Sequence, residues 1–110
     1  MEKYAFKMQL KPGKELAYER AHDEIWPELV ELLAEAGIQD YSIHLDTETN
    51  ALFGVLWRVD DQGMVRLPDS PVMQRWWEAM SEFLEMDDNG IPVAKPLRTV
   101  FHIHGNRDTA

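Results

Sequence analysis

The feature that most constrains the fold is a nine-residue segment, residues 51–59 (ALFGVLWRV), that is apolar at nearly every position. A strand that is apolar on both faces lies inside a sheet whose two faces are both covered. Its longest apolar run, residues 51–57, is far shorter than the ~20 residues that a membrane-spanning helix requires. The segment is therefore predicted to be a central strand of a soluble domain.

Three further segments have the pattern of strands. Residues 4–10 alternate apolar and polar side chains until Pro12 and Gly13 interrupt them, which predicts a first strand. Residues 39–46 (QDYSIHLD) predict a second strand, close enough to residues 51–59 for an antiparallel hairpin. The last strand is predicted over residues 97–103.

Two segments have the period of helices. Between residues 14 and 36, apolar and aromatic side chains recur every three or four positions: Tyr18, His22, Ile25, Leu29, Leu32 and Ala36. Gly37 is predicted to end this helix, and Pro27 predicts a break between itself and His22. A second helix is predicted to begin at Ser70 and Pro71, with an apolar side that extends to Leu84.

The order strand, helix, two strands, helix, strand predicts an α+β fold of the ferredoxin-like βαββαβ type. In this fold a four-stranded antiparallel sheet carries two helices on one face. We expect a single domain over residues 1–110, with residues 105–110 as a loose tail. Because the helices cover only one face, a second copy of the chain is predicted to cover the other, giving a dimeric α/β barrel.

Composition excludes several classes of function. Eleven Lys and Arg against twenty Asp and Glu give a net charge of −9, which disfavours nucleic acid and membrane surfaces as partners. The chain has no cysteine, and therefore no disulfide, thiolate nucleophile or zinc-thiolate site. Its first residues do not resemble a signal peptide, so we expect a cytoplasmic protein. No glycine-rich nucleotide-binding motif is present, which disfavours a nucleotide as ligand.

Tyr18 and His22 are the first candidate site residues. They stand four positions apart, so their side chains lie one above the other on a helix. An imidazole can give or take a proton near neutral pH, and a phenol can hydrogen-bond a sugar hydroxyl. On spacing alone, however, packing in the core is the favoured interpretation of the pair.

Three other aromatic residues are candidates for ligand binding. Trp76 and Trp77 are adjacent and therefore about 100° apart around a helix, so one can face the sheet and the other a cavity. Indole faces suit the C–H faces of a pyranose, although core packing is again favoured for the pair alone. Tyr41 has a hydroxyl that needs a partner, and a ligand is one possibility.

Histidines raise the question of a metal site. His102 and His104 alternate on one face of the last predicted strand, and His44 could join them if the strands pair suitably. No carboxylate or thiolate stands at matching spacing, so no metal is expected. The ligand that best suits the whole set of residues is small, neutral, hydroxylated and partly apolar.

Three segments together make the chain similar to the L-rhamnose mutarotase family: residues 22–29 (HDEIWPEL), 41–46 (YSIHLD) and 72–77 (VMQRWW). The resemblance extends from Lys3 to His102. It implies a cofactor-free homodimeric isomerase that interconverts the α and β anomers of L-rhamnose. It also implies site residues, with a proton donor at His22 and a sugar-binding set of Tyr18, Tyr41, Trp76 and Trp77. The loop over residues 86–92 (MDDNGIP) departs from the family pattern.

Two alternatives remain open from the sequence. A cofactor-free monooxygenase of the dimeric α/β-barrel type would also line its pocket with Trp and His, and fold alone does not decide function. A non-catalytic sugar-binding dimer would use the same aromatic side chains without moving a proton. For the mutarotase, the base is unassigned, and water, a carboxylate or a tyrosine could serve.

Overall fold

A computed structural model describes residues 1–105. The predicted tail therefore lies outside the described residues, apart from Gly105. The elements of the described chain are β1 (Glu2–Gln9), α1 (Glu15–Asp23), α2 (Pro27–Glu35), β2 (Ile38–Asp46), β3 (Ala51–Arg58), α3 (Gln62–Arg66), the 3-10 helix η1 (Leu67–Asp69), α4 (Pro71–Met80) and β4 (Lys95–Leu97).

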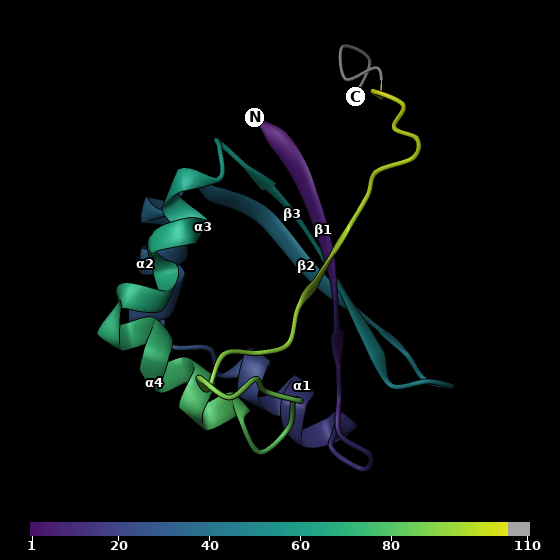
Figure 1. Cartoon of the computed structure of the whole chain (residues 1–110), viewed down its shortest axis with the longest axis vertical. Helices are drawn as coiled ribbons and strands as arrows, with labels where there is room; N and C mark the ends of the chain where they lie inside the picture. Colours follow the sequence, from purple (N-terminus) through teal and green to yellow (C-terminus); the bar gives the residue numbers. More distant parts are fainter. Residues whose placement is uncertain (106–110) are drawn as a thin grey trace.

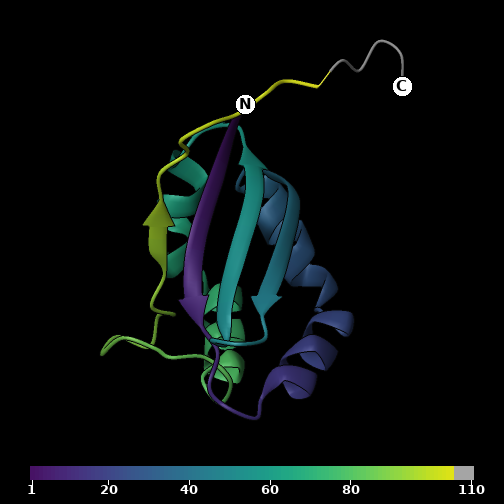
Figure 2. The same ribbon diagram turned by 90° about the vertical axis from the view of Figure 1, so that its right-hand side faces the viewer.

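The four strands form one antiparallel sheet in the order β2-β3-β1-β4. The apolar strand β3 lies inside the sheet, as predicted, and the order is that of the ferredoxin-like fold. The helices all lie on one face of the sheet (Figures 1 and 2). The predicted fold class is therefore confirmed, with two short helical segments, α3 and η1, added where the sequence indicated only a polar stretch.

The break in the first helix is confirmed. α1 ends at Asp23, and α2 begins with Pro27 at its first position, where the missing N–H of proline costs nothing. Gly37 follows α2 with a φ of +85°, a left-handed conformation that glycine adopts without strain. The second predicted helix, α4, is shorter than expected and ends at Met80 rather than near Leu84.

The prediction of a strand over residues 97–103 is wrong. Only Lys95–Leu97 pair with β1, opposite residues 5–7. Beyond Leu97 the chain leaves the sheet (Figures 1 and 2), so its alternating side chains have no neighbouring strand among the described residues. Three apolar side chains of this segment are at least three-quarters exposed: Val100, Phe101 and Ile103.

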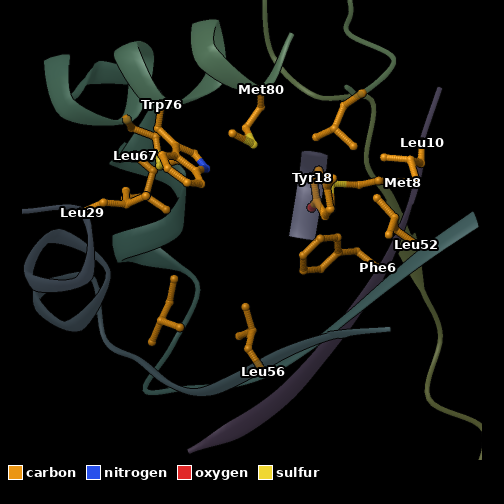
Figure 3. Packing of buried hydrophobic residues seen from close by; sticks show 13 residues of the cluster. Phe6, Met8, Leu10, Tyr18, Leu29, Leu52, Leu56, Leu67, Trp76 and Met80 are labelled. Carbon is orange, nitrogen blue, oxygen red and sulfur yellow. The ribbon is translucent and has the colours of Figure 1, made fainter. Parts of the chain in front are cut away.

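The hydrophobic core lies between the sheet and its helices (Figure 3). Leu10, Leu29 and Leu56 are its most completely buried side chains, and they come from the end of β1, from α2 and from β3. The described residues contain no helix long and apolar enough to cross a membrane.

Candidate active site

A cavity of about 800 Å³ lies on the helix-covered side of the sheet. All five predicted site residues line it: Tyr18 and His22 from α1, Tyr41 from β2, and Trp76 and Trp77 from α4. In Figure 3, Trp76 lies on one side of the packed cluster, and Phe6 and Tyr18 lie on the other. The fold thus brings together residues that the sequence separates by up to 59 positions, from Tyr18 to Trp77.

His22 is held in one orientation by its own helix. Its Nδ1–H donates to the backbone carbonyl oxygen of Tyr18 at 2.9 Å, and the Tyr18 ring packs against the imidazole at a centroid distance of 4.4 Å. A carbonyl oxygen only accepts hydrogen bonds, so Nδ1 carries a hydrogen. The nitrogen left to exchange a proton with a ligand is therefore Nε2.

The two adjacent tryptophans have different surroundings. Trp76 is only 6% exposed, and its ring meets His22 edge-to-face at 5.3 Å. Trp77 is partly buried and lines the same cavity. Trp76 therefore belongs both to the core and to the cavity wall, so the two interpretations of this residue are compatible.

Tyr41 faces the cavity because it alternates in phase with Ile43, which lies opposite Gly54 and so on the same side of the sheet as Phe6. Gln39 pairs with Trp57 and Ser42 pairs with Val55, so two residues of β2 stand opposite the one residue between those partners. Asp40, in the bulge, has a φ of +48°. The extra residue keeps the buried Ile38 on this side of the sheet as well, and the ring centroids of Tyr41 and Phe6 are 6.1 Å apart.

The two phenols of the cavity are poor acids. Burial raises the pKa of Tyr18 well above its ordinary value, and the neighbouring Tyr41 raises it further. Desolvation of the hydroxyl raises the pKa of Tyr41 to about 12, although 39% of the residue's surface is open. Both hydroxyls therefore remain protonated near neutral pH, where they can hydrogen-bond sugar oxygens but cannot act as phenolate bases.

Two carboxylates in the cavity wall were missed from the sequence. Glu15 and Glu19 line the cavity together with Tyr18 and His22. The four residues stand at positions i, i+3, i+4 and i+7 of α1, which is the spacing of a single helical face. This spacing could have indicated that the two glutamates face the cavity, but charged residues on a helix are normally expected to face solvent. Four methionines form part of the apolar lining: Met8, Met64, Met73 and Met80.

The structure does not gather the three candidate histidines. His44 shares a hydrogen bond with Ser42 at 2.9 Å, while His102 and His104 lie beside a separate pocket that includes Trp57. Within residues 1–105, no group of three or more His, Cys, Asp or Glu side chains is placed to hold a metal ion.

The fold and the cavity define a class, the ferredoxin-like α+β proteins with an aromatic-lined pocket between helices and sheet. A family model described as L-rhamnose mutarotase matches residues 3–103. The chain therefore belongs to the L-rhamnose mutarotase family.

Individual relatives agree with this assignment. The chain is 62% identical to an L-rhamnose mutarotase of Mesorhizobium japonicum, over 93% of this chain and 97% of the relative. It is 61% identical to an L-rhamnose mutarotase of Jannaschia sp., over 94% of this chain and 99% of the relative. The crystal structure of an L-rhamnose mutarotase from Formosa agariphila superposes with a TM-score of 0.87 at 36% identity, covering 94% of this chain and all of the other. A tetracenomycin F2 cyclase from Streptomyces glaucescens, at 15% identity and a TM-score of 0.67 over 96% of this chain and all of the other, shares the fold alone.

Proposed function

We propose that this chain interconverts the α and β anomers of L-rhamnose, with His22 as the residue that moves the proton. One observation carries the proposal: in a chain of the L-rhamnose mutarotase family, His22, whose Nδ1 is bonded to its own helix, lines one cavity together with the four aromatic residues predicted to bind the sugar. The chemistry needs only proton transfer and a shaped pocket for a neutral sugar.

Mutarotation requires two proton movements. The ring oxygen gains a proton while the anomeric hydroxyl loses one, so the C1–O5 bond breaks and an open-chain aldehyde forms. After rotation about the C1–C2 bond, the O5 hydroxyl attacks the other face of the aldehyde, the ring closes, and both protons return. His22, protonated at Nε2, would deliver the proton to the ring oxygen. The raised pKa values of Tyr18 and Tyr41 keep both phenols protonated, so neither can accept the second proton. Water or a cavity carboxylate would accept it instead.

The remaining site residues would hold the sugar. The hydroxyls of Tyr18 and Tyr41 can donate to sugar oxygens. The indoles of Trp76 and Trp77 offer apolar faces to the C–H side of the pyranose, and the methionines of the lining suit its methyl group. General acid–base assistance contributes about 10²–10⁴-fold, which suffices for a reaction that already proceeds in water.

We also propose that the chain is a homodimer. The helices leave one face of the sheet uncovered (Figure 2), which we call the open face. From the pairing of the strands, the apolar residues on this face are Ala5, Phe53, Val55, Trp57 and Leu97. The segment beyond Leu97 reaches this face through His102, which packs against Trp57, and it carries further exposed apolar side chains. A second copy would bury both surfaces, and symmetric dimers are the commonest homo-oligomers.

Saturation-transfer NMR across the two anomeric proton resonances of L-rhamnose tests the function. The wild-type protein should accelerate exchange, and His22→Ala should return it to the rate in buffer while the circular dichroism spectrum is unchanged. Full exchange activity in folded His22→Ala would remove His22 from the mechanism. Binding of L-rhamnose without accelerated exchange would identify a sugar-binding dimer, and oxygen consumption with a quinol-like substrate would favour a monooxygenase.

A further inference from the structure

Three aromatic rings form a continuous chain that ends at the proposed proton donor. Trp26 meets Trp76 edge-to-face at 5.1 Å, and Trp76 meets His22 in the same way at 5.3 Å. Both distances lie within the range in which aromatic pairs attract one another. Trp26 itself does not belong to the cavity lining, so it can influence a bound sugar only through its neighbours.

The backbone of Trp26 is fixed more firmly than that of an ordinary loop residue. It is the N-cap of α2 and has an extended conformation, with φ −68° and ψ 131°, which is the region imposed on any residue that precedes proline. Its carbonyl oxygen accepts the backbone N–H groups of Leu29 at 3.0 Å and Val30 at 3.1 Å. The Trp26 side chain thus projects from a rigid corner between α1 and α2.

His22 needs a second constraint beyond its helix. The hydrogen bond to the Tyr18 carbonyl oxygen fixes Nδ1, and the Tyr18 ring packs against the imidazole. Trp76 packs against the imidazole as a further contact. Trp76 comes from α4, a different part of the chain, so its indole holds His22 only as firmly as it is itself held, and Trp26 packs against it.

We infer that Trp26 is a positioning residue for His22 and acts through the indole of Trp76. Its role is to keep Nε2 aimed at the ring oxygen of the sugar during proton transfer, and in this respect the inference rests on the proposed function. A small misplacement of a reacting group far from the chemistry costs up to about a hundredfold in rate. The effect should therefore fall on turnover rather than on sugar affinity.

The test compares Trp26→Leu, which removes the ring, with Trp26→Phe, which keeps an aromatic ring against Trp76. Exchange rates measured by saturation transfer over a series of L-rhamnose concentrations separate kcat from KM. We expect Trp26→Leu to lower kcat about tenfold with KM changed by less than about twofold, and Trp26→Phe to keep kcat within about threefold of wild type. Phe83→Leu is the matched control, since Phe83 packs on the same core outside the cavity lining.

A second measurement does not depend on activity. Long-range ¹H–¹⁵N NMR, recorded at a pH where the imidazole is neutral, should show the Nδ1–H tautomer of His22 in the wild type and a mixture of tautomers in Trp26→Leu. Unchanged kcat and an unchanged imidazole spectrum in folded Trp26→Leu would overturn the inference. If Trp26→Leu does not fold, Trp26→Met, which keeps an apolar side chain of flexible shape, takes its place with the same expectations. Wild-type protein without anomer exchange would instead refute the proposed function, while the imidazole spectra would still test the positioning.

Discussion

Trp76 and Trp77 are neighbours in the chain but have different surroundings. Trp76 is 6% exposed and touches both His22 and Trp26, whereas Trp77 is only partly buried and lines the cavity. We therefore expect Trp77→Ala to weaken L-rhamnose binding by about 1–3 kcal/mol, which corresponds to a lost aromatic contact. Titration with L-rhamnose by calorimetry measures this change.

Trp76→Ala is the informative comparison for that experiment. Removing a buried tryptophan leaves a cavity in the core and costs about 3–5 kcal/mol of unfolding free energy, which urea denaturation would detect. Trp77→Ala should cost much less stability. Sugar titration of Trp77→Ala that matches the wild type would exclude its indole from the binding site.

Tyr41 provides a prediction at high pH. Desolvation raises its pKa from 10.0 to about 12 in the folded protein. Because the folded pKa lies above the unfolded one, the contribution to stability is complete below about pH 10 and is lost as the pH rises through 12. Urea unfolding over this range should show a steeper loss for the wild type than for Tyr41→Phe, which lacks the titrating group. Equal slopes for the two proteins would contradict the raised pKa.

The junction between α2 and α3 depends on a residue without a side chain. A Cβ on Gly63 would clash with the backbone carbonyl oxygen of Ala36, so the two helices could not keep their present separation. We expect Gly63→Ala to lower the unfolding free energy by about 1–3 kcal/mol, as overpacking generally does. Gln62→Ala, at an exposed neighbouring position, is the control. Urea denaturation of both variants measures the difference, and equal stability would show that the junction can relax.

Local patterns predicted those elements whose cause is local. Pro27 and Gly37 mark helix boundaries through their own backbone chemistry, and both boundaries are confirmed. The prediction of a strand over residues 97–103 failed because a strand needs a neighbouring strand to pair with, and the alternation of side chains in a sequence does not specify one. The helix α3 was missed because its five residues, none of them buried, are too few to show a helical period.

The candidate site was predicted through family resemblance rather than through spacing. Spacing alone favoured core packing for Tyr18 and His22, and the Tyr18 ring is in fact 7% exposed and part of the core. The bulge in β2, which keeps Ile38 on the cavity side together with Tyr41, has no glycine or proline at Asp40, so the sequence contains no turn signal for it. The sequence therefore indicated which residues line the cavity, but the geometry that joins them depends on tertiary structure.

At the scale of the whole molecule, the open face is the largest consequence of the fold. A sheet with helices on one side only leaves Phe53, Val55 and Trp57 of its inner strand on the face without helices, where the His102 ring packs edge-to-face against Trp57. Apolar surface of this kind in a protein of net charge −9 favours burial against a like surface, because the hydrophobic gain is short-ranged while charge repulsion is screened by salt.

The dimer can be tested by placing one charge at the centre of the open face. Val55 pairs with Ala5 on one side and Ser42 on the other, so Val55→Lys would bury an unpaired ammonium at a cost of several kcal/mol. We expect sedimentation equilibrium to give a dimer for the wild type and a monomer for Val55→Lys. Val30→Lys, at a position of α2 that is itself 49% exposed, should remain a dimer. A wild-type protein that sediments as a monomer, or a Val55→Lys dimer of unchanged affinity, would exclude the open face as the interface.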